Sequence, residues 1–521
     1  MASVMKFKKF AIATNDEIAA RVGLKTFKRG GNVVDAAVAT ALTLCVTKIA
    51  SNGIGGYGGF MLLNLPSEGE LALIDYNTRA PKAARDDTYE FVEEHVAGWK
   101  VVDNENEEGF RSISIPGTLA GLNLALEEYG NMNMSQILSY VVEVARRGII
   151  VDRSLRRSIS RSLAKLRKFK ETTKLLLVNG EPPPLNYTIN MKGLVNALEV
   201  ISKRGVSEFY SGEIGEKLTS YLEDNDSLLA FDDLQRYSPT ISKPLSYELD
   251  EYTILVPRDC SGGVTTLQIV ASFNLIEDKG SSPYDKVREL VNIMRNSWRD
   301  RLKYLGDPDY FSVPYSSLLS ENRLRELLEE KSLKYSNRGS YTEEGTIHLV
   351  VMSSNGDTVS LSQTLRSAFG SGVTAPYYDI ILNNGMGLFD PRPRRANSIA
   401  PFKRPLSNMT PVIVLKDDST YCSLGSPGGR GIISIVSLLL INLLIYNKEL
   451  SRALFAPRVH TVSFGHVYLD NKVEKGVELK LVEEGYKIVR VSRIGGPAAC
   501  ALIENEEKLL VACERGVPLG I

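Results

Sequence analysis

Residues 336 to 365 combine a polar segment with a predicted hairpin: SNRGSYTEEG (336–345), TIHLVVMSS (346–354), Asn355-Gly356 and DTVSLSQTL (357–365). The segment 336–345 is polar and has no aliphatic residue, which predicts a flexible, exposed tail. From residue 346 onwards, apolar and polar residues alternate on both sides of Asn355-Gly356, a strong signal for a hairpin. An exposed segment that leads directly into a core strand is unusual, unless the chain is cut there.

A cut before Thr346 would create an unusual nucleophile. The freed α-amine of a terminal threonine titrates near pH 8, so it can accept the hydroxyl proton of the same residue, directly or through water. Thr346 could make the cut itself, by attacking the carbonyl of Gly345 to give an ester that water opens. Glycine at 345 removes side-chain bulk beside that carbonyl. This chemistry needs no histidine, and the chain has only four.

A glycine pair offers donors for an oxyanion. The sequence SLGSPGGR (423–430) stands directly before the apolar run GIISIVSLLLINLLIY (431–446). The amides of Gly428 and Gly429 could therefore lie at a helix N-terminus and stabilise developing negative charge. The apolar run itself predicts a buried core helix, because a membrane span needs about 20 apolar residues.

The other patterns predict one globular unit without internal repeats. Residues 16–50 read as two helices, with Asp35 as the expected cap of the second. The glycines of SNGIGGYGGFMLLNL (51–65) predict a tight loop that leads into a buried strand. The segment from about residue 118 to about residue 240 is rich in charge and has a helical periodicity, which predicts a helical region around the core.

Composition excludes several classes of function. The 521 residues carry 62 basic and 62 acidic side chains, and this formal charge of zero argues against a general nucleic-acid-binding protein. The five cysteines are far apart and form no CxxC pair, so neither a disulfide framework nor a zinc site is indicated. We expect no metal and no organic cofactor. A reducing, cytoplasmic location is predicted, since the N-terminus has no apolar region long enough for a signal peptide.

Many ordered motifs resemble the γ-glutamyltranspeptidase family of N-terminal-nucleophile hydrolases, as a divergent prokaryotic member would. They cover nearly the whole chain: KRGGNVVDAAVATAL (28–42), SNGIGGYGGFMLL (51–63), SIPGTLAGL (114–122), FYSGEIGEKL (209–218), YLGDPDYF (304–311), GTIH (345–348), IILNNGM (380–386), KRPLSNMTP (403–411) and GSPGG (425–429).

The resemblance implies an α+β fold, an αββα sandwich made from one precursor. The precursor would be cut into a large subunit, residues 1–345, and a small subunit, residues 346–521. Thr346 would then be both nucleophile and base, and Thr364 the second threonine that hydrogen-bonds it. Gly428 and Gly429 would match the oxyanion hole, whereas a structural role is expected for His348.

Two departures concern the group that binds a donor carboxylate. Asn77 stands where the family usually has an arginine, and an amide lacks the charged fork of a guanidinium. Arg79, two residues further on, would lie on the same face of an extended segment. Whether it replaces the missing arginine stays open. Of the usual serine pair, Ser407 remains and its neighbour is Asn408.

The remaining departures concern the α-amino group of a γ-glutamyl donor. Arg366 replaces an asparagine, and Gly385 and Leu388 stand at acidic or amide positions. Placing an ammonium beside a guanidinium without a carboxylate is costly, which favours an anionic donor that has no α-amino group. The chain between Phe389 and Ser407 is short, which suggests an open site, and its arginines 392, 394 and 395 are interpreted as a solvated loop.

Three hypotheses follow. The first is a γ-glutamyl transferase and glutathione hydrolase that acts on small amides or peptides through an acyl-enzyme. The second keeps this mechanism but takes a donor without a free α-amino group, such as an oxamate-like amide or an N-acyl β-lactam. The third is an uncleaved binding scaffold without catalysis. The expected partners are the two subunits of one precursor, with no nucleic acid and no membrane; higher oligomers stay open.

Overall fold

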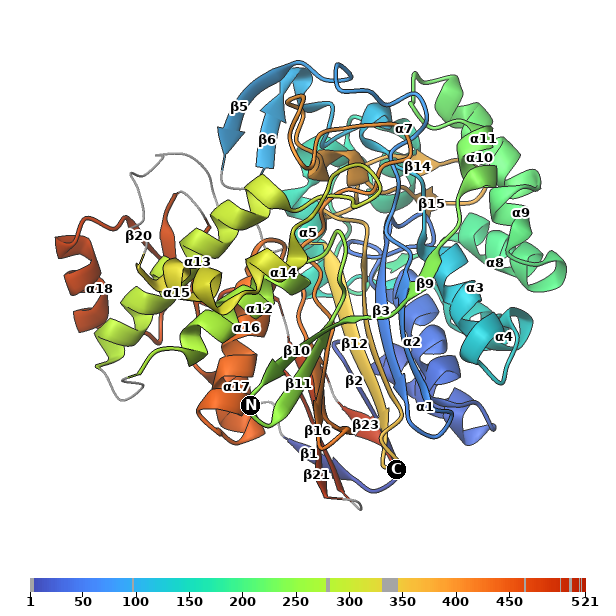
Figure 1. Ribbon diagram of the computed structural model, residues 1–521. Coiled ribbons are helices and arrows are strands. Elements are labelled where there is room, and N and C mark those ends of the chain that lie inside the picture. The colour runs from blue at the N-terminus through green and yellow to red at the C-terminus, as the bar shows by residue number, and fades with distance from the viewer. Residues whose placement is uncertain are drawn as a thin grey trace.

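Two antiparallel sheets lie face to face at the centre of the computed structural model (Figure 1). The structure describes residues 4–95, 98–277, 282–329, 345–462, 465–496, 498–505, 508–514, 516 and 518–521. In this part of the chain the first sheet has seven strands, in the order β1 (Met5–Phe7), β22 (Lys508–Cys513), β21 (Ala499–Asn505), β17 (Ser419–Gly425), β16 (Val412–Lys416), β11 (Tyr252–Val256) and β10 (Leu245–Leu249). The second, also of seven described strands, has the order β23 (Leu519–Gly520), β2 (Phe10–Thr14), β12 (Thr346–Ser353), β13 (Thr358–Thr364), β3 (Gly58–Leu65), β4 (Glu70–Asp75) and β9 (Thr240–Ser242).

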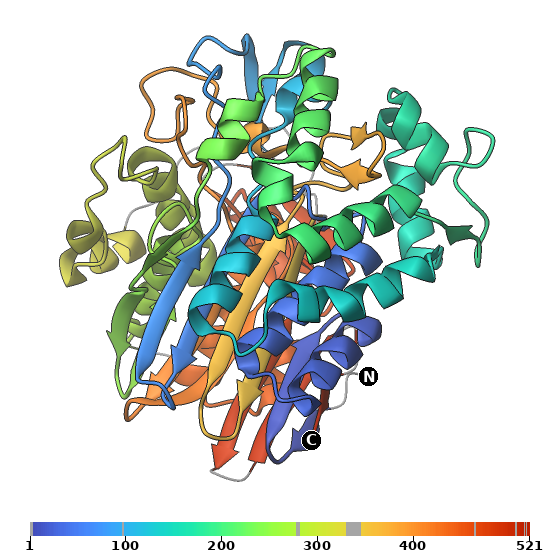
Figure 2. The same cartoon turned by 90° about the vertical axis from the view of Figure 1, so that its right-hand side faces the viewer.

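Helices cover the outer face of each sheet. The second sheet is covered by α1 (Glu17–Lys28), α2 (Val33–Thr47), α3 (Thr118–Tyr129) and α4 (Met134–Arg146), which share its hydrophobic core and lie in front of it in Figure 2. The first sheet is covered by α12 (Gly263–Asn274), α13 (Pro283–Tyr304) and α16 (Gly431–Leu440), which share a second core with it. The four layers form the predicted αββα sandwich.

Smaller elements surround the sandwich. The helices are α5 (Arg153–Arg161), α6 (Leu163–Leu166), α7 (Lys170–Leu176), α8 (Lys192–Arg204), α9 (Ser207–Tyr210), α10 (Glu213–Glu223), α11 (Phe231–Arg236), α14 (Tyr315–Leu318), α15 (Glu321–Glu329), α17 (Leu450–Phe455) and α18 (Lys475–Glu483), with 3₁₀ turns at Val102–Asn104, Phe110–Ser112 and Gly385–Leu388. The strands are β5 (Phe91–His95), β6 (Gly98–Val101), β7 (Ile149–Ile150), β8 (Thr188–Ile189), β14 (Thr374–Ala375), β15 (Ile380–Ile381), β18 (Val459–His460), β19 (Val467–Asp470) and β20 (Ile488–Val491). The series from α3 to α11 confirms the helical region predicted for residues of about 118–240.

The predicted hairpin is the pair β12 and β13, in the middle of the second sheet. Both strands are buried along their whole length, because helices cover one face and the first sheet covers the other. Ile347, Leu349 and Val351 belong to the core shared with the helices, whereas Val350 and Met352 pack against the first sheet. Since side chains alternate between the two faces of a strand, the even-numbered residues of β12 face the other sheet.

Two helix predictions can be compared with the structure. The apolar run 431–446 is a buried helix, α16, continued by a π-helical turn at Ile441–Ile445. The second predicted helix begins earlier than expected: its N-cap is Asn32, and Asp35 is the third helical residue. The expectation that Asp35 is the cap was wrong because the two residues form a capping box, in which Asp35 binds back to the amide of Asn32.

The predicted flexible tail 336–345 lies outside the described residues, except for Gly345. Among the described residues, no helix combines the length and the apolar composition needed to cross a membrane. The boundary between residues 345 and 346 stays a prediction, and so do the two subunits that it would create.

Candidate active site

Thr346 is the first residue of β12 and lies directly opposite Thr364, the last residue of β13. Directly opposed residues of an antiparallel pair project from the same face of the sheet. Both threonines have the parity of Val350, so both side chains face the space between the two sheets. They are largely buried, with 8% and 2% of their surface exposed. The fold therefore brings together the two threonines that the sequence singled out.

The hydroxyl of Thr364 already has one partner. Its Oγ1 accepts a hydrogen bond of 2.7 Å from the backbone amide of Arg366. A hydroxyl that accepts in this way still has its own proton to donate. Because Thr346 lies directly opposite, its hydroxyl could accept that proton. The hydrogen bond between the two threonines stays a prediction, and the strand register supports it.

Gly345 occupies a position that only glycine fits. Its φ is +118°, a conformation that residues with a side chain rarely adopt, and a Cβ there would lie 1.9 Å from the carbonyl oxygen of Arg366. Arg366 itself has a φ of +85°. Gly345, directly before the predicted cleavage bond, and Arg366, whose carbonyl oxygen packs against Gly345, therefore both have a positive φ.

The predicted oxyanion donors follow the strand β17, whose last residue is Gly425. A Cβ at Gly425 would lie 2.3 Å from the ring of His348, so β17 contacts β12 two residues from Thr346. Beyond Gly425 the chain turns through Gly428 and Gly429, with φ values of +144° and +56°, and then enters α16. Gly428 and Gly429 therefore stand at a helix N-terminus as expected, and their role at an oxyanion stays a prediction.

His348 is a buried spacer between the two sheets. It is 2% exposed, its Nδ1 shares a hydrogen bond of 2.8 Å with the hydroxyl of Ser362, and its ring packs on Gly425. Burial lowers the pKa of His348 from its ordinary 6.5 to about 3. A neutral histidine packed in this way fits the structural role that the sequence analysis gave it.

Acid should weaken the fold through this residue. The unfolded chain protonates His348 near pH 6.5 and the folded chain does not until about pH 3, so the free energy of unfolding decreases as the pH falls below 6.5. We expect a loss of about 1 kcal/mol from this residue between about pH 6 and pH 5. Urea unfolding of a Thr346→Ala chain, which keeps the chain whole, measures it. Adding His348→Asn should remove that part of the loss.

The control for this experiment is Ser362→Ala, which removes the partner of Nδ1 and leaves the histidine in place. It should lower the stability at every pH without changing the pH dependence. An unchanged pH dependence in the His348→Asn chain would show that the histidine is protonated equally in the folded and unfolded states.

Ser407 is linked to Thr364 through Tyr57, a residue that the sequence analysis did not single out. The backbone amide of Tyr57 donates to the carbonyl of Thr364 at 3.1 Å, and its hydroxyl shares a hydrogen bond of 2.7 Å with the hydroxyl of Ser407. Tyr57 is 2% exposed. It therefore spans the distance from the second threonine to the predicted substrate-binding serine.

A buried cation supports the same segment. Arg301 is 1% exposed and donates hydrogen bonds to the carbonyl oxygen of Ser407, at 2.5 Å, and to Oδ1 of Asn408, at 3.0 Å. Burial, with the positive charge of Arg430 nearby, lowers the pKa of Arg301 to about 9. Within the part of the chain that the structure describes, no carboxylate forms an ion pair with Arg301. The site therefore carries positive charge beneath Ser407 and Asn408.

Asn77 and Arg79 both bind carbonyl oxygens of one segment. Nδ2 of Asn77 donates to Pro405 at 3.0 Å, and Nη1 of Arg79 donates to Phe402 at 3.1 Å. The buried Oδ1 of Asn77 has no hydrogen-bond partner within the described structure. Compensation of the missing family arginine by Arg79 stays a hypothesis, because its guanidinium already binds Phe402.

The structure gives Arg366 a partner that the sequence analysis missed. The Arg366 guanidinium forms a two-pronged ion pair with the carboxylate of Glu107, with Nη2 2.6 Å from Oε1. The same guanidinium donates to the carbonyl oxygen of Gly387 at 2.9 Å. The expectation of a cation without a nearby carboxylate was therefore wrong. Glu107 lies 259 residues before Arg366, so no local pattern could reveal this pair.

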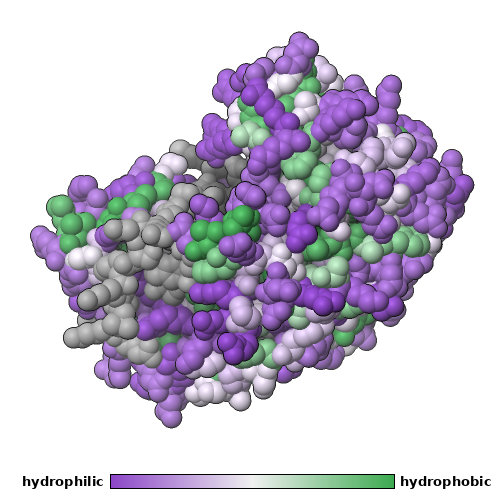
Figure 3. Space-filling model, turned by 90° about the horizontal axis from the view of Figure 1, so that it is seen from above, coloured by the Kyte–Doolittle hydropathy of each residue, from purple (hydrophilic) through white to green (hydrophobic). Residues whose placement is uncertain are grey.

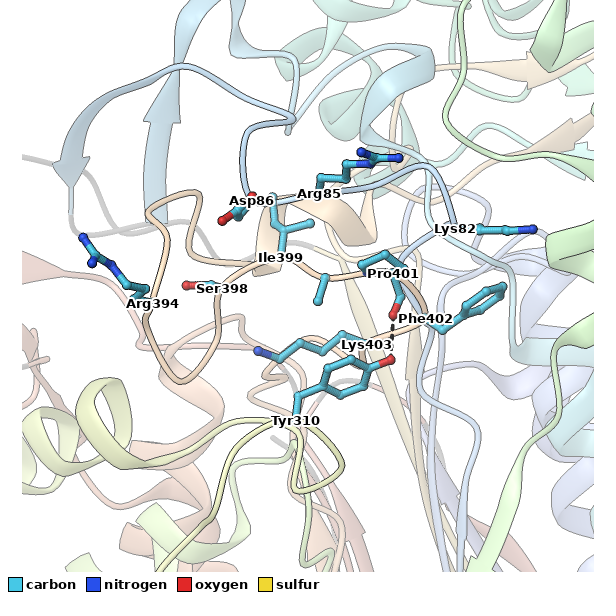
Figure 4. A pocket seen from close by; sticks show the side chains of 11 residues that line it. Lys82, Arg85, Asp86, Tyr310, Arg394, Ser398, Ile399, Pro401, Phe402 and Lys403 are labelled. Atoms are coloured by element: carbon cyan, nitrogen blue, oxygen red, sulfur yellow. Dashed lines mark hydrogen bonds between the residues drawn. The ribbon is translucent and has the colours of Figure 1, made fainter.

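A pocket of about 790 Å³ includes Phe402, whose carbonyl oxygen binds Arg79. It is lined by Lys82, Arg85, Asp86, Tyr310, Arg394, Ser398, Ile399, Ala400, Pro401, Phe402 and Lys403. Figure 4 shows the side chain of Lys403 running along the ring of Tyr310, with Ile399 and Pro401 above them and Arg394 at one end. The loop interpreted as solvated thus places Arg394 at a pocket, whereas Arg392 forms an ion pair with Asp390.

The surface seen from above is mostly hydrophilic, with small separate hydrophobic areas (Figure 3). Across the described ranges, no three His, Cys, Asp or Glu side chains come together in a group that could hold a metal ion. The polar groups described around Thr346 and Thr364 are hydroxyls, amides, the Arg366–Glu107 ion pair and the buried Arg301. Groups of these kinds can bind an amide and stabilise the charge that develops when it is hydrolysed.

The layers and the threonine pair define the class: the chain has the fold of the N-terminal-nucleophile hydrolases. It superposes on the crystal structure of a cephalosporin acylase from Bacillus halodurans with a TM-score of 0.88, at 23% sequence identity, over 99% of this chain and 96% of that one.

Residues 19–515 match the model of the family described as Gamma-glutamyltranspeptidase, and the chain belongs to this family. It is 33% identical over 503 residues to the "Glutathione hydrolase proenzyme" of Bacillus subtilis (strain 168), covering 91% of this chain and 84% of that protein. It is 30% identical over 525 residues to the "Acylase ACY 1 proenzyme" of Pseudomonas sp. (strain V22), covering 98% and 93%.

Proposed function

We propose that the chain is a self-processing threonine amidohydrolase and acyltransferase. The observation that carries this proposal is the position of Thr346, which begins a buried core strand directly after a glycine of φ +118° and faces Thr364. Relatives whose names include "proenzyme" support a precursor that is cut into two subunits. The subunits are residues 1–345 and 346–521, and they stay together as one enzyme.

The reaction follows from the groups at the site. After cleavage, the α-amine of Thr346 accepts the proton of the Thr346 hydroxyl, and Oγ attacks the carbonyl carbon of a small amide. The amides of Gly428 and Gly429 stabilise the resulting oxyanion. The C–N bond breaks, the amine leaves with the proton, and the acyl group stays on Oγ as an ester. Water then releases a carboxylic acid, or a second amine takes the acyl group.

Positive charge at the site favours an anionic acyl group without an α-amino group. Arg301 lies beneath Ser407 and Asn408, with no carboxylate partner among the described residues, whereas Arg366 is already paired with Glu107. An ammonium group on the donor would meet the positive charge of Arg301, and it would lose its hydration without gaining a free carboxylate. This is the acylase hypothesis, and the "Acylase ACY 1 proenzyme" is a relative that covers nearly the whole chain.

A pair of chromogenic donors tests this choice. Glutaryl-p-nitroanilide and γ-glutamyl-p-nitroanilide differ only in the α-amino group. We expect kcat/KM for the glutaryl donor to be higher by about tenfold or more, which corresponds to about 1.4 kcal/mol of transition-state binding. Release of p-nitroaniline measures both reactions. Acetyl-p-nitroanilide, which has neither charge, shows how much of the difference comes from the carboxylate.

The second candidate is γ-glutamyl transfer with glutathione hydrolysis. It is favoured by the 33% identity to a glutathione hydrolase proenzyme and by the retention of Ser407. A γ-glutamyl donor that reacts as fast as the glutaryl donor would support this candidate and overturn the choice of donor. A chain that is never cut and cleaves no amide would favour the binding scaffold.

A further inference from the structure

An ion pair next to the nucleophile carries an inference about donor selection. Arg366 and Glu107 bind each other through both guanidinium Nη atoms and both carboxylate oxygens. Their side chains are 13% and 24% exposed. The pair is therefore largely desolvated, and a part of each side chain stays exposed. Charge on a bound molecule at such a place has a large effect on binding.

The neighbours of the pair leave room for it. A Cβ at Gly387 would lie 2.8 Å from Cζ of Arg366 and 2.7 Å from the carbonyl oxygen of Asn106. A side chain at 387 and the guanidinium thus exclude each other. Asn384 fixes the other partner, because its Nδ2 donates to the carbonyl oxygen of Glu107 at 2.8 Å. The presence of Arg366 and the absence of a side chain at 387 belong together.

The same arginine lies against the reacting bond. Its backbone amide binds Oγ1 of Thr364, and its carbonyl oxygen packs on Gly345. An acyl group on Thr346 is therefore attached within a residue or two of the Arg366 backbone. A charged substituent a few bonds along that acyl group comes close to the guanidinium and to Glu107.

We propose that Glu107 is a specificity-determining residue, an ammonium-binding carboxylate that Arg366 occupies. With Arg366 in place, the guanidinium takes the position of a donor ammonium and Glu107 is already paired. Without Arg366, the Glu107 carboxylate is free to bind the α-ammonium of a γ-glutamyl donor. This inference rests on the proposed acyl-enzyme at Thr346, and it adds a residue of the large subunit to donor selection.

Four proteins test it: the wild type, Arg366→Asn, Glu107→Gln and the double variant. Asparagine suits position 366 because it tolerates a positive φ better than most residues. We expect Arg366→Asn to raise kcat/KM for γ-glutamyl-p-nitroanilide by about tenfold or more, mainly through KM. The double variant should lose this gain, since Gln cannot pair with an ammonium as a carboxylate does. Glu107→Gln alone should not produce the gain.

Each variant also needs a readout that is independent of turnover. Binding of L-glutamate and of glutarate to the cleaved enzyme, measured by calorimetry, reports on the same charge selection. We expect Arg366→Asn to shift the ratio of the two dissociation constants towards glutamate by about tenfold, and the double variant to shift it back. Cleavage into two chains, seen by intact mass, shows that each variant has folded.

The outcomes separate the two proposals. If no variant cleaves either donor but glutamate binding follows this pattern, the proposed donor is wrong and the role of Glu107 stands. If Arg366→Asn gains neither glutamate binding nor γ-glutamyl turnover, the inference is overturned. The same holds if the double variant gains as much as the single one, because the gain would then not depend on the Glu107 carboxylate.

Discussion

Replacing Thr346 by alanine should leave a single chain of full length and abolish amide hydrolysis. Alanine has no hydroxyl to attack the carbonyl of Gly345, so no ester forms and no α-amine is released. Intact mass under denaturing conditions should show one mass for Thr346→Ala. The wild type should show two masses that meet between residues 345 and 346. We expect activity to fall by a factor of at least about 10³, because nucleophile and base are lost together.

The matched control is Thr346→Ser, which keeps a hydroxyl and, after cleavage, an α-amine. It should still be cut, and it should keep part of its activity. A Thr346→Ala chain that is cut at the same bond would show that cleavage comes from another nucleophile or from a protease. A wild type that is never cut would remove the basis of the mechanism, and the altered donor site would then indicate loss of catalysis.

Replacing Gly345 by alanine should block or strongly slow the cleavage. The new Cβ would lie 1.9 Å from the carbonyl oxygen of Arg366, a backbone atom that cannot turn aside as a side chain does. Either Gly345 or the segment at Arg366 has to move, which displaces the carbonyl that Thr346 attacks. Misplacement by about 1 Å can cost a factor of about 10² in rate, so we expect a half-time at least tens of times longer. Mass spectrometry over time after expression measures it.

The control for this experiment is Gly30→Ala. Gly30 has a comparable φ of +94°, but a Cβ there would have no atom within 4 Å. This variant carries a similar backbone cost, of about 1 kcal/mol or more, without the clash. It should be cut at the wild-type rate. Equal slowing in both variants would mean that general destabilisation, and not the contact with Arg366, limits the cleavage.

Local patterns predicted the centre of the fold because they report on local structure. The alternation around Asn355-Gly356 identified the hairpin β12–β13, and the mostly apolar 16-residue run 431–446 identified a buried helix. Thr346 is the predicted nucleophile because a polar, glycine-containing segment meets a core strand there. The helix start was misplaced by three residues because Asn32 and Asp35 form one reciprocal cap, and either could be taken for the first residue.

The contacts that shape the donor site could not be predicted, because they join distant parts of the chain. Tyr57 and Ser407 are 350 residues apart, and Glu107 and Arg366 are 259 residues apart. Arg301 sits in a long charged helix, where nothing in the sequence separates a buried arginine from the solvated ones. Such pairs depend on how the sheets stack, which one sequence does not reveal.

The order of the strands determines how the two pieces of the proposed cut enzyme would stay together and refold. Strands from before residue 345 pair directly with strands from after it in both sheets: β1 pairs with β22, β2 with β12 and β23, β3 with β13, and β11 with β16. A cut between residues 345 and 346 would leave all five ladders intact, so backbone hydrogen bonds would hold the two pieces together. Once opened by heat or urea, however, two separate chains must meet again, and refolding becomes dependent on concentration. The proposed cut would therefore turn refolding from a process within one chain into the assembly of two chains.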